Sequence, residues 1–593
     1  MGIGIIISRR RPRVVTRKGK PFAANPLLAE RLPRWRSRLL QLLLLSAFAV
    51  LAGRAAWLQL YTGEFLQRQG AYRYARTLEL PGVRGRILDR HGEMLATSVP
   101  ALSVWAIPKD LRTAPAQSLR ELARLLEMED AALAAKLAAA GNFVELKAGV
   151  APATGPRLAA LRIPGLGVTA GSRRVYPQGA TAAHVVGFMG RDGKGLEGIE
   201  LADQQRLEGR HGRRRIIRDR LGNIVEDQGA LSWPRPGRDS VLSIDGKLQY
   251  AAYKALKDAV QTFHAKAGSA IALDVRTGEI LALANYPAYD PAHPGARAGG
   301  AVRNRALTDS YELGSVLKPF TVALAIERGK VGPDTPVDTG AGRFVIQGAP
   351  ITDTSAHGLI SVAEVLRYSS NIGTAKLALD LAPRDMWEMF TSLGFGQPPQ
   401  LGFPGASAGR VRPYRAWRPV EQATMSYGNG IAVSLVQLAR AYTVFAGDGS
   451  VIPLTLARSD APAPGVRVLS AATAAAMRRM LEDVVEQGTA RQGRIAGYRV
   501  GAKTGTAYKA ENGRYAFPRK YVASFAGLVP MSAPRFVVAV MIDEPGGRYH
   551  YGGQVAAPVF TAIAAQALQR ANVAPDAPVT ELIAPPDPAA IDD

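Results

Sequence analysis

The stretch that decides the fold class is Ser269-Ala270-Ile271-Ala272-Leu273-Asp274-Val275-Arg276-Thr277-Gly278-Glu279-Ile280-Leu281-Ala282-Leu283-Ala284. Two apolar runs suited to strands flank a Thr-Gly turn signal, so the stretch predicts a β-hairpin. Helical patterns follow at 320–328, 361–382, 433–446 and 471–487, and strand patterns return at 498–507, 521–529 and 535–543. Strands, then helices, then strands again predict an α+β domain with an antiparallel sheet flanked by helices.

The region upstream of this domain reads as an irregular, β-rich module. It is dense in Gly, Arg and β-branched residues, with one helical pattern from Leu119 to Leu137. The Pro-rich run Trp233–Gly237 is a plausible boundary. We therefore expect one module over 61–235, in which we see no catalytic constellation, and a second domain over 236–573. The Pro/Ala/Asp-rich residues 574–593 are expected to form a disordered tail.

The N-terminus combines a basic arm with an apolar run. Residues 1–38 hold eleven Arg and Lys residues against Glu30 alone, and an apolar run over 39–60 follows. As a helix these 22 residues span about 33 Å, enough to cross a bilayer, and a basic flank favours a cytoplasmic N-terminus. A cleaved signal peptide, with Ala47-Phe48-Ala49 as the cleavage site, and a buried core helix are the alternatives. The long basic leader favours an uncleaved single transmembrane anchor.

Composition excludes several classes of function. The net charge is +25, but the second basic cluster has no interleaved aromatic residues on which bases would stack, so we expect no nucleic-acid binding. The absence of cysteine excludes a disulfide scaffold, thiolate catalysis and Cys-ligated metals. The seven histidines lack paired ligand spacing, so we expect no metal and no cofactor. The second basic cluster comprises Arg210, Arg213, Arg214, Arg215, Arg218 and Arg220.

The segment Tyr311-Glu312-Leu313-Gly314-Ser315-Val316-Leu317-Lys318-Pro319 holds the only Ser-x-x-Lys of the chain. Pro319 is tolerated in the first turn of a helix, which places Ser315 at a helix start. Positions i and i+3 share a helix face, so the Lys318 amine can reach the Ser315 hydroxyl. A Ser nucleophile needs a base, and Lys serves when desolvation and a nearby cation lower its pKa. Taken alone, the tetrapeptide is equally a surface Ser and Lys at helical spacing.

A second segment, Lys503-Thr504-Gly505-Thr506, occurs once and follows a strand pattern. Lys503 is a candidate for the second cation and for steering a substrate carboxylate. Thr504 and Thr506 offer hydroxyl donors for that carboxylate, and Gly505 would let a ligand backbone approach the strand. The N–H groups of Thr506 and Ser315 are candidates for an oxyanion hole. A solvent-facing strand end with a Gly turn is the alternative.

The third segment, Ser369-Ser370-Asn371, is the only Ser-x-Asn of the chain. Its Ser369 hydroxyl is suited to relaying a proton, and the Asn371 amide to holding a substrate carbonyl. A helix N-cap is the alternative interpretation.

The order of the three motifs resembles that of penicillin-binding proteins and β-lactamases. From the anchor to about residue 570 the sequence resembles the class B penicillin-binding proteins, most closely their division-specific branch. Further family-like stretches are 84–92, 195–200, 274–278, 304–309, 426–430 and 551–560.

The resemblance implies a periplasmic serine-type D,D-transpeptidase anchored in the inner membrane. Ser315 would attack the penultimate D-Ala carbonyl of a peptidoglycan stem peptide with Lys318 as base, and β-lactams would trap the same serine. The implied catalytic set is completed by Ser369, Asn371 and Lys503, and Thr504, Gly505 and Thr506 would bind substrate. Implied partners are an FtsW-type glycan polymerase and other division proteins.

Two other functions fit parts of the sequence. A serine β-lactamase or β-lactam sensor shares the acylation chemistry, but the long module before the catalytic domain and the basic arm disfavour it. A non-catalytic division scaffold would use only the anchor and residues 62–235.

Overall fold

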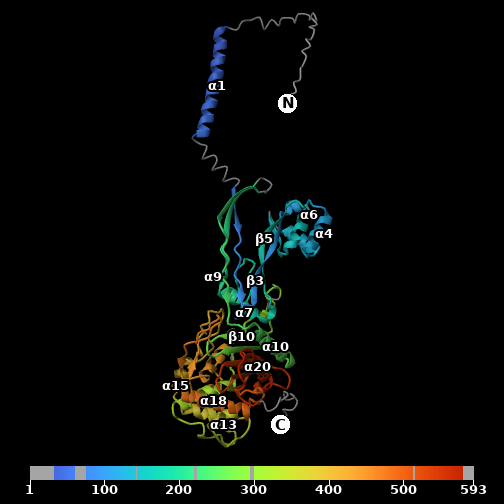
Figure 1. Ribbon diagram of the computed structural model, residues 1–593. Helices are drawn as coiled ribbons and strands as arrows, with labels where there is room; N and C mark the ends of the chain where they lie inside the picture. Colours follow the sequence, from blue (N-terminus) through green and yellow to red (C-terminus); the bar gives the residue numbers. More distant parts are fainter. Residues whose placement is uncertain are drawn as a thin grey trace, which may run out of the picture. The chain divides into compact units, whose positions relative to one another are not determined.

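The computed structural model describes residues 33–60, 75–139, 141, 143–218, 224–293, 295, 299–511 and 514–578. Helix α1, Arg34–Leu60, is long and apolar enough to cross a membrane, and none of its residues is buried (Figure 1). A core helix would bury one face against the protein, so this exposure disfavours that alternative. The helix begins five residues before the expected anchor. Residues 1–32 of the expected arm lie outside the described residues.

Residues up to Glu79 and residues 213–232 form one compact unit. In addition to α1, this unit contains a three-stranded sheet in the order β1-β6-β7. Its strands are β1 at Ala75–Leu80, β6 at Gly212–Arg218 and β7 at Ile224–Ser232. Strand β6 carries part of the second basic cluster, and its Arg214 Nε donates to Asp227 Oδ1 at 2.8 Å. The basic cluster is therefore at least partly an ion-paired face of a β-ribbon.

The second unit, residues 80–212 and 233–593, begins with a sheet in the order β4-β3-β2-β8, to which β5 adds through β3. Strands β3 and β5 pair antiparallel along ten residues, from Thr97↔Val175 to Ala106↔Leu166. The module is β-rich, as expected. The strand bounds are Ile87–Leu88 (β2), Met94–Ala106 (β3), Val144–Val150 (β4), Leu166–Val175 (β5) and Ser240–Val241 (β8).

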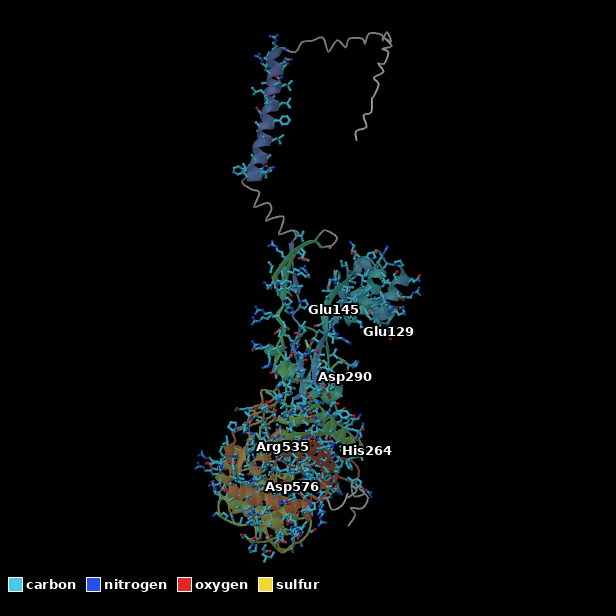
Figure 2. All side chains as sticks on the ribbon, viewed as in Figure 1. Glu129, Glu145, His264, Asp290, Arg535 and Asp576 are labelled. Atoms are coloured by element: carbon cyan, nitrogen blue, oxygen red, sulfur yellow. The ribbon has the colours of Figure 1, made fainter. Side chains whose placement is uncertain are left out.

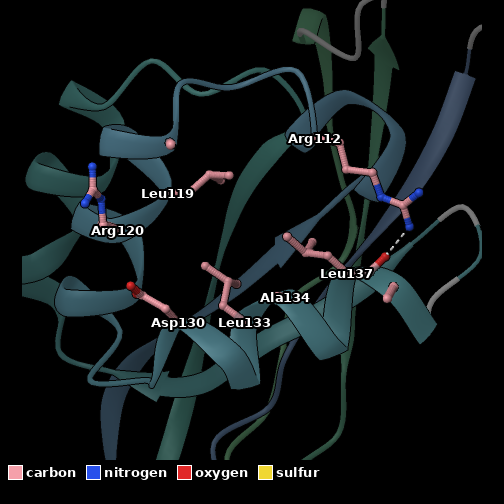
Figure 3. A pocket seen from close by; sticks show the side chains of 9 residues that line it. Arg112, Leu119, Arg120, Asp130, Leu133, Ala134 and Leu137 are labelled. Atoms are coloured by element: carbon pink, nitrogen blue, oxygen red, sulfur yellow. Dashed lines mark hydrogen bonds between the residues drawn. The ribbon is translucent and has the colours of Figure 1, made fainter.

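The helical pattern expected from Leu119 to Leu137 as one patch is two helices, α4 at Ala116–Leu125 and α5 at Asp130–Ala139. Glu127 between them has φ 50°, a left-handed conformation that a continuous helix cannot contain. A cavity of about 340 Å³ lies between the two helices and is lined mainly by apolar side chains, including Leu119, Leu133 and Leu137 (Figure 3).

A buried ion network holds the base of this module together. Glu200 is fully buried and accepts from Arg84 Nε and Arg174 Nε, each at 2.7 Å. Arg174 also donates to the Gly85 carbonyl at 2.8 Å. The two family-like stretches 84–92 and 195–200 are thus parts of one network, a partnership that spacing alone does not reveal.

The same base is continuous with the catalytic domain. Asp89 Oδ2 accepts from the Gly246 N–H at 3.0 Å, where helix α10, Gly246–Thr262, begins. Arg90 pairs with Glu279 at 3.2 Å, directly after the turn of the predicted hairpin. Ile87 and Leu95 belong to the same hydrophobic cluster as the catalytic sheet.

The catalytic sheet has five antiparallel strands in the order β10-β9-β21-β20-β17. Its strands are β9 (Ala267–Asp274), β10 (Ile280–Tyr286), β17 (Gly501–Tyr508), β20 (Tyr521–Val529) and β21 (Phe536–Asp543). The expected hairpin and the three later strands are all present, which confirms the α+β class. Strand β17 lies at one edge of this sheet.

Helices pack on the sheet as expected. Helices α10 and α20, Ala557–Arg570, pack against each other and the sheet, and α17, Leu435–Tyr442, also packs on the sheet's central strands. The described part of this domain also contains shorter helices. Among them are α12 (Lys318–Glu327), α13 (Val362–Arg367), α14 (Asn371–Leu379), α15 (Pro383–Ser392) and α16 (Pro419–Ser426). The longer α18 spans Ala471–Glu486.

One expected helix is wrong as a single element. The pattern over 361–382 is divided into α13 and α14, because Ser369 between them has φ 59°. Of the expected tail, residues 579–593 lie outside the described residues. Asp576, labelled in Figure 2, accepts from the Arg499 N–H at 2.7 Å.

Replacing Glu200 tests the buried network. Glu200→Ala leaves two buried guanidinium groups without their carboxylate, so we expect a loss of about 3–5 kcal/mol in the stability of the module. Glu121→Ala is the matched control, because Glu121 pairs with Arg124 on the exposed surface and its loss should leave stability nearly unchanged. Thermal and urea unfolding of both variants measure the difference, and equal losses would contradict the assignment.

Candidate active site

The nucleophile candidate lies on a short 3₁₀ turn, Gly314–Leu317, that leads directly into α12. Pro319 occupies the first turn of α12, as expected from its missing N–H. Ser315 is partly exposed, whereas Lys318 is fully buried. The sequence-based placement of Ser315 at a helix start is thereby confirmed.

The two lysines meet at Ser369. Lys503 Nζ donates to Ser369 Oγ at 2.9 Å and Lys318 Nζ donates to the same oxygen at 3.2 Å. Lys318 Nζ also donates to the Ser369 carbonyl. Three segments separated by more than 50 residues therefore converge on one hydroxyl.

The structure gives Lys318 a different hydrogen-bond partner from the one first expected. Within the described ranges no hydrogen bond joins Lys318 Nζ to Ser315 Oγ; the amine is held by Ser369 instead. Spacing within one turn placed the two groups on the same helix face, but the hydrogen bonds to Ser369, between α13 and α14, decide where the amine points.

Burial changes the protonation of both lysines. Desolvation, with the neighbouring Lys503 charge, holds the pKa of Lys318 well below its usual value, and Asp353 acts in the opposite direction. Desolvation lowers the pKa of Lys503 to about 7. No carboxylate of the described chain forms a salt bridge with either amine. A neutral amine at Lys318 beside a partly charged Lys503 is suited to base catalysis with an adjacent anion-binding group.

The Ser-x-Asn segment serves both interpretations at once. Ser370 is the N-cap of α14 and accepts from the Gly373 N–H at 2.9 Å, while Ser369 faces the lysines. The Asn371 side-chain amide donates to the Thr352 carbonyl at 2.9 Å.

The Lys-Thr-Gly-Thr segment lies on β17 as expected. Thr504 Oγ1 lies 2.9 Å from Thr489 Oγ1, and Thr506 Oγ1 accepts from the Gly552 N–H at 3.1 Å. Gly505 also has a packing role that its motif did not suggest. A Cβ there would lie 2.3 Å from both the Leu313 carbonyl oxygen and Ser524 Oγ, so the missing side chain lets the nucleophile turn approach the strand.

Sequence reasoning missed two groups at the site. Asp353 lies in the loop after β13, Ala349–Thr352. Its carboxylate accepts hydrogen bonds from the Ser370 hydroxyl and from the Asn371 backbone N–H. Tyr427 lies with its ring centroid 6.0 Å from Lys318 Nζ. The only available signal for Tyr427 was its place in the family-like stretch 426–430, and for Asp353 there was none.

Family models match two regions of the chain. Residues 268–565 match the penicillin-binding protein transpeptidase domain, and residues 79–242 match the penicillin-binding protein dimerisation domain. Among curated proteins, a probable peptidoglycan D,D-transpeptidase PenA of Neisseria gonorrhoeae is 42% identical over 90% of this chain and 92% of its own. The peptidoglycan D,D-transpeptidase FtsI of Escherichia coli K12 is 37% identical over 92% of this chain and 93% of its own.

Solved structures of penicillin-binding proteins are also similar to this chain. The transpeptidase domain of penicillin-binding protein 3 from Burkholderia pseudomallei is 52% identical, covering 57% of this chain and 98% of that one with a TM-score of 0.53. Penicillin-binding protein 3 of Mycobacterium tuberculosis, solved with aztreonam, is 28% identical over 85% of this chain and 99% of that one, with a TM-score of 0.65.

The close approach at Gly505 is testable by substitution. Gly505→Ala places a methyl group against the Leu313 carbonyl oxygen and Ser524 Oγ, so we expect overpacking to cost about 1–3 kcal/mol of stability. Gly447→Ala is the matched control, because no atom lies within 4 Å of its added Cβ. Thermal unfolding measures both, and an unchanged Gly505→Ala transition would contradict the tight contact.

Proposed function

The chain belongs to the penicillin-binding protein transpeptidases, and we propose that it cross-links peptidoglycan stem peptides through an acyl-enzyme on Ser315. The observation that carries this proposal is the convergence of Lys318 and Lys503 on Ser369 beside the turn that holds Ser315. The relatives named D,D-transpeptidases align over nine-tenths of the chain, which favours this function over a β-lactamase, a sensor or a scaffold.

In the proposed reaction, Ser315 Oγ attacks the penultimate D-Ala carbonyl. Its proton passes to the neutral amine of Lys318, and a bond forms between Oγ and the carbonyl carbon. The C–N bond to the terminal D-Ala then breaks, and that leaving amine takes the proton, with Ser369 suited to relay it. An amine of a neighbouring stem peptide repeats the sequence in reverse and releases Ser315 with a new amide.

The groups around Ser315 have complementary proposed roles. The N–H groups of Ser315 and Thr506 would stabilise the oxyanion, and Asn371 would hold a substrate carbonyl. Lys503, with Thr504 and Thr506, would bind the terminal carboxylate of the peptide. Because β17 is an edge strand and Gly505 keeps the nucleophile turn against it, a stem peptide can add along that edge.

We also propose the division of the chain and its place in the cell. The family matches at 79–242 and 268–565 support a non-catalytic module over 61–235 and a catalytic domain over 236–573. The basic arm before α1 supports a cytoplasmic N-terminus in the inner membrane and a periplasmic catalytic domain. The likeness to FtsI supports a role in septal wall synthesis with an FtsW-type glycan polymerase and other division proteins.

Ser315→Ala tests the nucleophile. We expect the full-length variant to fold normally but to form no covalent adduct with penicillin, while the wild-type chain gains one adduct that maps to the peptide containing Ser315. Ser310→Ala is the control, because this nearby serine precedes the motif and should label as the wild type does. Intact-protein mass spectrometry with peptide mapping measures both, and an adduct on Ser315→Ala would refute the assignment.

The absence of cysteine makes the membrane orientation testable with single cysteines. A cysteine at the exposed Lys254 should react with an impermeant maleimide applied to the periplasmic side of intact cells. A cysteine in place of Ser8 should react only after permeabilisation. The reverse pattern would refute the proposed orientation.

A further inference from the structure

The catalytic hydroxyl candidate Ser369 is held in an uncommon backbone conformation. Its φ of 59° lies in the left-handed region, which residues with a Cβ adopt at a cost. This conformation ends α13 and turns the chain so that Ser369 Oγ faces both lysines while Ser370 caps α14. Something outside the turn must hold it.

Besides the two lysines that donate to Ser369, Asp353 contacts this turn from outside. Its Oδ2 accepts from Ser370 Oγ at 2.5 Å, and its Oδ1 accepts from the N–H groups of Asn371 and Ile372 at 2.6 and 3.1 Å. One carboxylate therefore satisfies the first two N–H groups of α14 and the hydroxyl of its N-cap residue. A negative charge is also favourable at a helix N-terminus.

The loop that carries Asp353 is itself fixed to the turn. The Asp353 N–H donates to the Gly342 carbonyl at 3.2 Å, and the Asn371 side-chain amide donates to the Thr352 carbonyl. Four residues on, the His357 ring stacks on Tyr368 with centroids 4.6 Å apart and planes 9° apart. Tyr368 directly precedes Ser369 and Asn371 follows it closely, so the loop contacts the chain on both sides of Ser369.

Asp353 is also the acidic group that acts on the buried lysine. The titratable groups facing the Lys318 amine are Lys503 from β17, Tyr427 after α16, and Asp353. Of the two charged groups, Asp353 favours the ammonium form of Lys318, whereas Lys503, like burial, opposes it.

We propose that Asp353 is a positioning residue for the acylation step: it holds the Ser369 hydroxyl between the two lysines and supplies the counter-charge of the site. The inference rests on the proposed transpeptidase function. Asp353 acts through Ser369 and Lys318, and it need not touch the substrate.

The two parts of this role separate in one experiment on the full-length chain. The second-order rate constant of acylation by penicillin is measured from about pH 5 to about pH 10 for four proteins. These are the wild type, Asp353→Asn, Ser370→Ala and Asp338→Asn. Asp338 is the matched control, because it is exposed and its carboxylate accepts only from the Gly340 N–H in the described part of the chain.

Asp353→Asn should change both the plateau and the pH profile. Loss of the paired hydrogen bonds should lower the plateau rate constant about fivefold or more. Loss of the charge lowers the pKa of Lys318 further, so the neutral base persists to lower pH. The acid limb should therefore move to lower pH by on the order of half a unit or more.

The other variants isolate each part. Ser370→Ala keeps the carboxylate but loses one contact with it, so its plateau should fall while its acid limb stays in place. Asp338→Asn should match the wild type in both respects. Thermal unfolding of every variant accompanies the kinetics.

Each result decides. An Asp353→Asn profile like the wild type, or a lower plateau with an unmoved acid limb, overturns the inference. If Asp353→Asn does not fold, an unchanged plateau in Ser370→Ala overturns it. A wild-type chain that forms no adduct refutes the proposed function and the inference with it, whereas a normal wild-type adduct with an unchanged Asp353→Asn profile refutes the inference alone.

Discussion

The site depends on the burial of two lysine amines against a single hydroxyl. Lys318 and Lys503 are both fully buried, and both donate to Ser369 Oγ. Two cations in so small a volume, without a carboxylate in contact, are unstable together. Desolvation and the neighbouring Lys503 charge lower the pKa of Lys318, and desolvation lowers that of Lys503. The lowered pKa of Lys318 therefore arises from packing and not from a dedicated partner such as a His–Asp pair.

Close backbone approach keeps the nucleophile turn where those amines lie. A Cβ at Gly314 would lie 2.9 Å from the Thr506 carbonyl oxygen, one at Gly428 would lie 2.3 Å from the Gly314 carbonyl oxygen, and one at Gly505 would clash with the Leu313 carbonyl. Ser524 Oγ and Tyr442 Oη then bond the Leu313 and Val316 carbonyls at 2.9 and 2.8 Å. The turn is thus positioned by contacts of its backbone, and none of these contacts uses the Ser315 side chain.

The sequence predicted the chemistry of the site better than its geometry. The identities and order of Ser315, Lys318, Ser369 and Lys503 were sufficient to expect one cleft, because each motif occurs once and carries a complementary group. The N-cap interpretation of Ser369-Ser370-Asn371 indicated a helix start here, but the left-handed conformation of Ser369 was not predictable, since the apolar pattern runs through 361–382 and a left-handed serine has no local signature. Asp353 was missed for a related reason: its partners are fixed by the packing of a loop against α14, and an acidic residue in a polar loop predicts only a turn.

In the fold, too, local sequence patterns predicted individual elements but not the contacts between distant segments. Alternation and turn signals predicted β9, β10, β17, β20 and β21, but not the junction between the module and the sheet. There, Asp89 accepts from the first N–H of α10, and Arg90 pairs with Glu279 beside β10. Because α10 packs on β10 and β9, and pairing continues through β21 and β20 to β17, the base of the module is built into the same core as the strand that carries Lys503. A substitution at this junction would therefore disturb the catalytic domain's own core, so the stretch at 84–92 is best understood as part of that domain's support as well as of the module.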